Sequence, residues 1–224
     1  MPGSVPRTLT SARKGAAPGT ARRVVIFVHG YGADGADLLG LADPLAPHLP
    51  DTAFYSPNAP ERCTNNPMGY QWFPIPWLDG SSEAAARAGM EAAVADLNAF
   101  IDKVLEDEGL APEALALVGF SQGTMMSLHV APRRPAPLAA VVGFSGRLMA
   151  PEALAAETVS RFPVLLIHGD ADEMVPVSDL PKAADALTGA GFETYAHVCK
   201  GLGHGIDNEG LSLALQFLRD KLPK

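Results

Sequence analysis

The sequence predicts an α/β fold, and three observations support this prediction. Short apolar runs alternate with helical patterns along the chain, as expected for βαβ units around a buried parallel sheet. Glycine or proline punctuates nearly every apolar run, which indicates turns between the elements. The chain has 224 residues, of which 47% are hydrophobic, so a single domain with a sizeable core is expected.

Six apolar segments have the length and composition of strands. They span residues 23–28, 52–56, 115–119, 139–144, 164–168 and 194–198. A strong helix is expected over 83–108, because apolar residues recur there every three or four positions along one face. A shorter helix begins near Ser178 and ends by Gly189, and Asp207 is a suitable N-cap for a last helix that runs to about Lys221.

The start of the chain differs from the rest in composition. It is rich in glycine, proline, serine and basic residues, so we expect a flexible tail over 1–20 and a single domain over 21–224. The tail has no apolar signal-peptide core, and no apolar run approaches the roughly 18 residues of a membrane span. We therefore expect a cytoplasmic protein without stable membrane insertion.

Charge and cysteine content exclude several kinds of function. The chain has 17 Lys and Arg against 25 Asp and Glu, a net charge of −8, and no basic stripe, so nucleic acid is not an expected partner. Its two cysteines, Cys63 and Cys199, are too few for a disulfide framework, and no Cys/His cluster has zinc-ligand spacing. The sequence therefore predicts a small-molecule substrate and neither a metal nor an organic cofactor.

The strongest local signal is a G-x-S-x-G motif, Gly-Phe-Ser-Gln-Gly, at residues 119–123. It directly follows a predicted strand and directly precedes a helical run over 124–130, which is the setting of a nucleophile elbow. The two glycines allow a tight turn that lifts Ser121 into a cleft. The N–H of Gln122 points to the same space near a helix N-terminus, where negative charge is stabilised. Ser121 is therefore the candidate nucleophile.

A similar pentapeptide, Gly-Phe-Ser-Gly-Arg, follows the next strand, but Arg147 replaces the second glycine. Ser145 is therefore expected to be structural. Phe144 and its neighbours Leu148 and Met149 are expected to wall the cleft, because loops at the carboxyl ends of adjacent parallel strands converge there.

A serine hydroxyl needs a base, and the base needs an acid that holds its tautomer. His204 lies in a glycine-flanked loop between the last strand and the last helix and is the candidate base, whereas the other five histidines are expected to be structural. The strand over 164–168 opens into a turn with Asp170 and Asp172. One of these carboxylates is expected to cap the turn and the other to meet the imidazole. The order Ser, Asp, His is that of an α/β-hydrolase.

Three glycines follow the first predicted strand, in the run Val-His-Gly-Tyr-Gly-Ala-Asp-Gly at residues 28–35. The spacing matches neither a P-loop nor a dinucleotide-binding fingerprint. Such a loop lets the backbone approach a ligand closely. We expect the N–H of Tyr31 to form an oxyanion hole with that of Gln122, and His29 to brace the loop.

These motifs are more specific together than singly. VIFVHGYGADG, QWFPI, GFSQG, LLIHGDADEMVP and GLGHGI, in this order, resemble the carboxylesterase/phospholipase family of serine hydrolases, which includes acyl-protein thioesterases and small bacterial carboxylesterases. The resemblance implies an α/β-hydrolase fold, with helices on both faces of a mostly parallel sheet and no large cap domain. It also implies that Asp172 is the acid that partners His204. The residues that it places near an acyl-binding groove are Trp72, Met174 and Val175.

The sequence thus predicts a serine carboxylesterase that works through an acyl-enzyme. Short- to medium-chain esters are the expected substrates, because no insertion is long enough for a separate lid and Tyr31, where family members commonly carry leucine, narrows the site. An acyl-protein thioesterase or a lysophospholipase is the alternative among enzymes, and a hydrolase-fold ligand-binding protein is the alternative outside them. The apolar residues expected to flank Ser121 are Trp72, Phe73, Ile75, Met174 and Val175.

Overall fold

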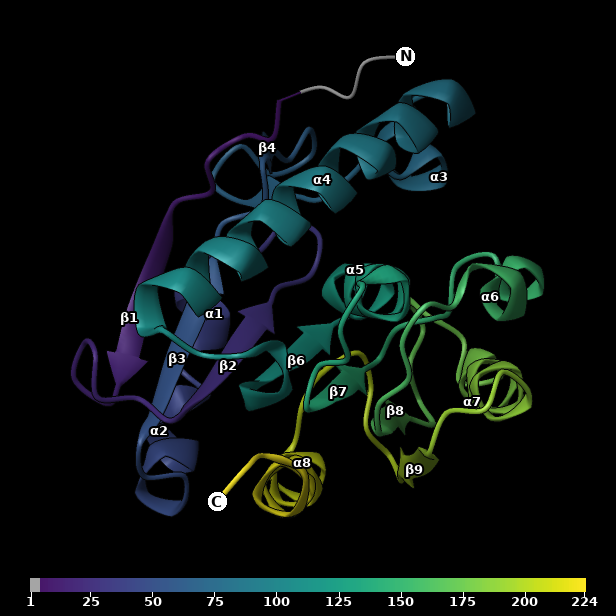
Figure 1. Cartoon of the computed structure of the whole chain (residues 1–224). Helices are drawn as coiled ribbons and strands as arrows, with labels where there is room; N and C mark the ends of the chain where they lie inside the picture. The colour runs from purple at the N-terminus through teal and green to yellow at the C-terminus, as the bar shows by residue number, and fades with distance from the viewer. Residues whose placement is uncertain (1–4) are drawn as a thin grey trace.

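A seven-stranded sheet with the order β1-β3-β2-β6-β7-β8-β9 forms the centre of the molecule (Figure 1). The computed structural model describes residues 5–224. β1 runs antiparallel to β3, and all other neighbouring pairs of this sheet are parallel. The strands are β1 (Ser11–Gly15), β2 (Arg23–Val28), β3 (Thr52–Pro57), β6 (Leu115–Phe120), β7 (Ala140–Phe144), β8 (Val164–Gly169) and β9 (Thr194–Cys199). All six predicted strands are present, so the α/β prediction is confirmed.

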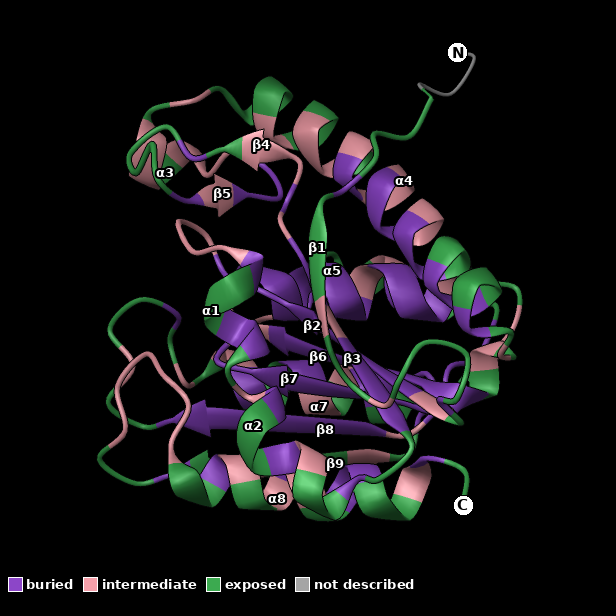
Figure 2. Cartoon of the chain, turned by 90° about the vertical axis from the view of Figure 1, so that its left-hand side faces the viewer, coloured by how far each residue is buried: buried purple, intermediate pink, exposed green. Residues whose placement is uncertain are grey.

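Helices cover both faces of this sheet (Figures 1 and 2). Side chains of α4, α5, α6 and α7 join one core, and those of α1, α2 and α8 join the other. The helices are α1 (Gly35–Leu39), α2 (Ala42–Leu45), α3 (Pro76–Asp79), α4 (Glu83–Glu108), α5 (Gln122–Val130), α6 (Pro151–Glu157), α7 (Asp179–Gly189) and α8 (Asn208–Lys221). Within residues 5–224, no helix combines the length and apolar character that a bilayer crossing requires.

Alternation of side chains along the strands divides the interior into these two cores. In β2, Val24 and Ile26 pack on the side of α4, whereas Val25 and Phe27 pack on the side of α1 and α2. Because both faces are covered, nearly every residue of the central strands is buried, as Figure 2 shows, and their sequences are nearly continuous apolar runs.

The expectation of a flexible tail over 1–20 is wrong for the segment that forms β1, and residues 1–4 of that tail lie outside the described residues. Each of the five β1 residues pairs with a residue of β3. Arg13 also reaches Glu108 of α4, with its Nε 2.8 Å from the carboxylate Oε1, and it hydrogen-bonds the Tyr55 hydroxyl. Ahead of the strand, Arg7 forms an ion pair with Asp96 of α4 at 2.7 Å. The strand has no apolar signal because its side chains are mostly exposed at the sheet edge, and pairing and ion pairs hold it in place.

Several short elements were also absent from the prediction. α1, α2, α3 and α6 have between four and seven residues, too few to show a helical period. A second sheet, formed by β4 (Glu61–Arg62) and β5 (Tyr70–Gln71), lies in the connection between β3 and α4. The connection continues through α3 toward the carboxyl ends of the parallel strands, where the candidate site lies.

Candidate active site

Ser121 occupies the sharp turn between β6 and α5. Its backbone has φ 53° and ψ −115°, a conformation that L-residues rarely adopt, and its N–H donates to the carbonyl of Phe144 at 2.9 Å. Both flanking glycines are required by close backbone approach. A Cβ on Gly119 would lie 2.5 Å from the backbone nitrogen of Thr124, and a Cβ on Gly123 would overlap the carbonyl of Val28. The turn therefore has the geometry of a nucleophile elbow.

The imidazole of His204 is held between an acid and an aromatic ring. Its Nδ1 lies 2.8 Å from Oδ2 of Asp172, and its ring centroid lies 4.9 Å from that of Phe120. Because an ionised carboxylate only accepts hydrogen bonds, Nδ1 carries the proton and Nε2 is left as the basic nitrogen. The His204 side chain stays partly exposed, whereas the Asp172 side chain is fully shielded from solvent.

Three hydrogen-bond donors surround the buried carboxylate of Asp172, one of which is Nδ1 of His204. The backbone N–H groups of Met174 and Val175 donate to its Oδ1 at 2.9 Å each. Burial acts to raise the pKa of Asp172, but the hydrogen bonds from His204, Val175 and Met174 outweigh burial and hold this pKa below its usual range. His168 also lies at this carboxylate: its Nε2–H donates to the carbonyl of Val175 at 2.9 Å, and the same nitrogen lies 3.2 Å from Oδ2 of Asp172. The sequence analysis did not predict a second histidine beside the acid.

Asp170 takes the other position that the sequence left open. Its Oδ1 accepts the backbone N–H of Gly201 at 2.6 Å, which joins the β8 turn to the start of the His204 loop. Asp172, two residues farther on, contacts the imidazole. Asp170 is thus the turn cap, and Asp172 is the partner of His204.

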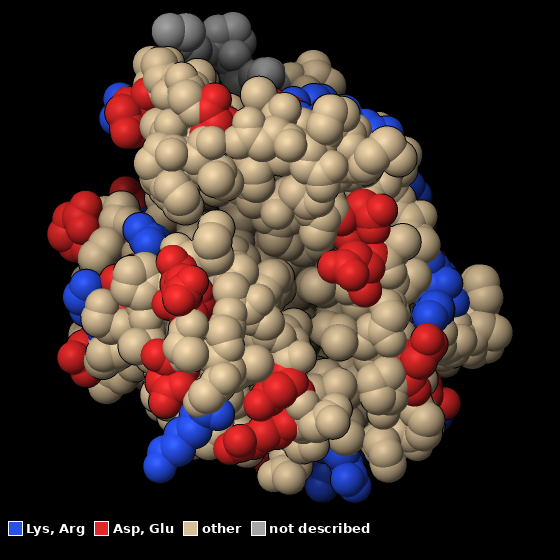
Figure 3. All heavy atoms as spheres, turned by 180° about the vertical axis from the view of Figure 1, so that it is seen from behind, with Lys and Arg blue, Asp and Glu red and all other residues tan. Residues whose placement is uncertain are grey.

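A cavity of about 420 Å³ lies between Ser121 and His204 and opens at the carboxyl ends of the strands. Figure 3, which shows the molecule from behind, is hollowed near its centre, and most of the surface around the hollow carries no charged side chain. Four of the apolar residues expected to flank Ser121 line the cavity, namely Phe73, Ile75, Met174 and Val175. The other lining residues include Tyr31, Gln122, Trp77, Arg147 and Met149.

Trp72 and Phe144 were also expected at the groove, and the structure corrects both assignments. Trp72 is fully buried, and its Nε1–H donates to the carbonyl of His29 at 3.0 Å. The Phe144 side chain packs in the core that α8 covers, on the side of β7 away from α5. Its backbone carbonyl accepts the N–H of Ser121 at the elbow. Both residues support the site from within the core, because strand alternation and loop packing decide which side a ring faces.

The Gln122 side chain has a role that the motif did not reveal. Its Oε1 accepts the backbone N–H of Trp72 at 2.9 Å, and its Nε2–H donates to the carbonyl of Phe73 at 2.8 Å. Gln122 is buried, so these bonds are shielded from water. The residue after the nucleophile therefore fixes the wall of the cavity to the elbow.

The loop after β2 is fixed by His29. One ring nitrogen, Nδ1, lies 2.7 Å from the carbonyl of Gly30, and the other, Nε2, accepts the N–H of Ala59 at 2.9 Å. The ring is buried, and burial lowers its pKa, so it is neutral with the proton on Nδ1. Tyr31 follows in the chain, and its hydroxyl lies 3.4 Å from Oδ2 of Asp79 across the mouth of the cavity.

Ser145 lies outside the cavity lining, as expected for a structural residue. It is buried, its N–H donates to the carbonyl of Ile167 at 2.9 Å, and its hydroxyl lies 3.5 Å from the carbonyl of Gly205. Met149 lines the cavity as expected, and so does Arg147, whereas Leu148, which was also expected at the cavity wall, is buried and outside the lining.

Comparison with known proteins gives matches over nearly the whole chain. A family model described as phospholipase/carboxylesterase matches residues 15–222. The esterase YpfH of Escherichia coli K12 is 30% identical, over 91% of this chain and 85% of that protein, and acyl-protein thioesterase 1 of Gibberella zeae is 28% identical, over 89% and 90%. The crystal structure of esterase PE8 has a TM-score of 0.90 and 44% identity, over 96% of this chain and 100% of that chain.

Proposed function

The chain belongs to the phospholipase/carboxylesterase family and is a carboxylic ester hydrolase, and we propose that Ser121, His204 and Asp172 carry out its catalysis. The observation that carries this proposal is the contact of 2.8 Å between His204 and the buried Asp172, next to a cavity that Ser121 also lines. The proposal rests on this arrangement together with the elbow geometry at Ser121.

The reaction begins when Nε2 of His204 takes the Ser121 proton and the serine oxygen attacks the ester carbonyl. The tetrahedral oxyanion is held by the backbone N–H groups of Tyr31 and Gln122, the second of which is the first residue of α5. Asp172 stabilises the imidazolium that forms. His204 then protonates the leaving alcohol, and a water molecule, activated by the same imidazole, hydrolyses the acyl-enzyme.

The cavity favours a short or medium acyl chain. Apolar side chains of Phe73, Met125, Met149 and Met174 line it, and its volume of about 420 Å³ is at the low end of ligand pockets. Each methylene removed from water contributes about 0.8 kcal/mol, so kcat/KM rises at most roughly fourfold per methylene while the chain still fits. We place the end of this rise at about four to eight carbons.

A series of p-nitrophenyl esters from acetate to palmitate, with matched thioesters and lysophospholipids, tests this assignment. The expected profile rises and then falls beyond about eight carbons. A profile that climbs beyond about twelve carbons, or a strong preference for thioesters, would support the acyl-protein thioesterase or lysophospholipase alternative. Thioester substrates are included because an acyl-protein thioesterase is among the relatives, at 28% identity. The higher identity to an esterase, 44%, favours esters as the substrates.

Three further inferences concern the class of protein, the bounds of its domain and its location. A ligand-binding protein without turnover has no need of a complete Ser, His and Asp set, so we infer an enzyme rather than a binding protein. We also infer that residues 21–224 form one domain, to which β1 adds an edge strand from the preceding segment, and that the protein acts in the cytoplasm. The last inference is supported by Cys63 and Cys199, which are both free thiols.

A further inference from the structure

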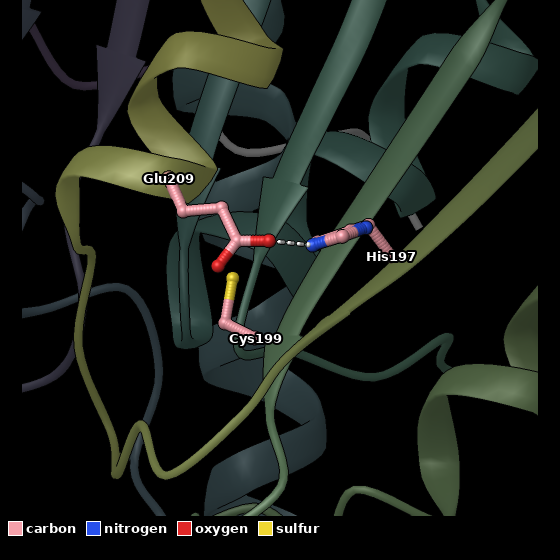
Figure 4. Close-up of side chains that lie close together, drawn as sticks. All are labelled: His197, Cys199 and Glu209. Atoms are coloured by element: carbon pink, nitrogen blue, oxygen red, sulfur yellow. Dashed lines mark hydrogen bonds and ion pairs between the residues drawn. The ribbon is translucent and has the colours of Figure 1, made fainter.

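The face of β9 that α8 covers carries a group of side chains that the catalytic machinery does not use. His197 and Cys199 are two residues apart, so they project to the same side of the strand. α8 packs on that side, and Glu209 lies in its first turn. Figure 4 shows the three side chains pointing toward one another, two from β9 and one from α8.

The three side chains lie close enough together to approach a shared ion. Nε2 of His197 lies 2.7 Å from Oε1 of Glu209, and one donor atom from each of the three residues lies within 4.8 Å of the others. Metal–ligand distances of about 2.0 to 2.3 Å place the donors of a tetrahedral zinc site about 3.3 to 3.8 Å apart. Tetrahedral ligation therefore requires Nε2 of His197 and Oε1 of Glu209 to move apart, and a donor pair at the 4.8 Å limit to move about 1 Å closer.

The chemistry of the donors also selects the class of ion. A thiolate and an imidazole are typical ligands of zinc and of other late first-row metals, whereas magnesium and calcium prefer sets made of oxygen alone. Cys199 is buried, but the side chains of His197 and Glu209 are 34% and 58% exposed, so an ion can enter from the solvent side. Three protein ligands leave a fourth position for water.

We propose that His197, Cys199 and Glu209 form a site for a divalent transition-metal ion of the zinc class. Binding converts the Cys199 thiol to a thiolate, and the proton is released to solvent. Without the ion, burial and the nearby carboxylates of Asp207 and Glu209 raise the pKa of the Cys199 thiol to about 11, so the thiol is protonated at neutral pH. The sequence did not reveal this site because Glu209 joins the other two ligands only through the packing of α8.

The position of the site gives it a structural consequence. His197 and Cys199 precede the loop that carries His204, and Glu209 follows it, so an ion on all three residues ties the two ends of this loop together. The ion would thereby stabilise the folded chain, since it binds no preformed site in the unfolded one. This inference concerns binding alone and stands whether or not His204 is the catalytic base.

Cobalt(II) added to the reduced, metal-free protein tests the assignment, because a cobalt–thiolate bond gives a charge-transfer absorption that imidazole and carboxylate ligands do not. We expect this band in the wild type and its loss in Cys199→Ser. Weaker cobalt binding, by about tenfold or more, is expected in His197→Gln and Glu209→Gln, whose positions are partly or largely exposed. Cys63→Ser and His48→Gln are the matched controls and should retain both the band and the affinity.

Thermal unfolding with zinc gives a second, independent measurement. At a free zinc concentration 100-fold above the dissociation constant, we expect the Tm of the wild type to rise by about 5 to 10 °C. The rise should disappear in His197→Gln, whose fold is checked by circular dichroism without metal. The proposal is overturned if the wild type gives no charge-transfer band, if the band follows Cys63 instead, or if His197→Gln and Glu209→Gln bind cobalt as tightly as the wild type does.

Discussion

Asp172 accepts a hydrogen bond from Nδ1 of His204 at 2.8 Å while Nε2 of His168 lies 3.2 Å from the same carboxylate oxygen. The carboxylate is shielded from solvent and also receives two backbone N–H groups. Its position is therefore fixed by the turn after β8, and His204 is oriented by it from a different segment of the chain. Loss of the charge at Asp172 should therefore act first on the tautomer and orientation of the His204 imidazole.

Exchange of either aspartate for asparagine separates their roles. We expect Asp172→Asn to lower kcat by about 10³ to 10⁴, because the imidazole loses the acid that holds its tautomer. Asp170→Asn removes only part of a turn cap and should act mainly on the free energy of unfolding. The measurement is kcat for a p-nitrophenyl ester with folding checked by circular dichroism. A dead Asp170→Asn enzyme beside an active Asp172→Asn enzyme would reverse the assignment.

The Gln122 side chain should contribute to stability as well as to the shape of the cavity. In Gln122→Leu the buried N–H of Trp72 and carbonyl of Phe73 lose their partners. The free energy of unfolding should fall by about 1 to 3 kcal/mol, measured by urea denaturation. Gln216→Leu, at an exposed position of α8, is the matched control and should change stability by less than about 0.5 kcal/mol. Equal effects of the two substitutions would contradict the role given to Gln122.

Acidification should weaken the folded state through His29. Burial lowers its pKa in the folded protein, whereas the unfolded chain has a histidine pKa of about 6.5. The unfolded chain therefore binds the proton more tightly, so the stability from the neutral ring is complete above about pH 6.5 and is lost as the pH falls below it.

Urea denaturation of the wild type and of His29→Gln between pH 5 and 8 measures this effect. The wild type should lose up to about 1.4 kcal/mol per pH unit more than the variant below pH 6.5. His48→Gln removes an exposed histidine and should keep the wild-type slope. Parallel pH profiles for the wild type and His29→Gln would show that this ring does not couple stability to pH.

The edge strand β1 should stabilise the fold through Arg13. Arg13→Ala leaves the carboxylate of Glu108, whose side chain is 2% exposed, without its cation, so we expect the free energy of unfolding to fall by about 3 kcal/mol. Lys14→Ala is the control, because Lys14 pairs with the exposed Asp43 and such pairs contribute about 1 kcal/mol or less. A result near zero for Arg13→Ala, measured by urea denaturation, would mean that β1 is held by backbone pairing alone.

Local sequence patterns predicted the parts of the site that depend on neighbouring residues. Ser121 was found because two glycines and a strand-to-helix change surround it, and His204 because its loop joins a strand to a helix. The central strands were found because both of their faces are buried, which makes them apolar throughout. The two aspartates remained open in the residue pattern because both lie at the end of the same strand, and their spacing alone does not show which one meets the imidazole.

Features that arise from packing between distant segments were not predicted. The edge strand β1 has no apolar pattern because its side chains are mostly exposed. Trp72 was assigned to the groove from the family resemblance and its apolar character, although its indole N–H is bonded inside the core. Likewise, the contact of His168 with Asp172 and the position of Glu209 beside Cys199 exist only after the chain has folded.

The most direct test of the account is the position of a covalent adduct after reaction with a fluorophosphonate probe. Wild type, Ser121→Ala and Ser145→Ala are treated under the same conditions, and the modified peptide is identified by mass spectrometry. We predict a single adduct on Ser121 in the wild type and in Ser145→Ala, and none in Ser121→Ala, which should also lose about 10⁶ in kcat. An adduct on another residue, or labelling that persists in Ser121→Ala, would contradict the assignment of Ser121 as the nucleophile.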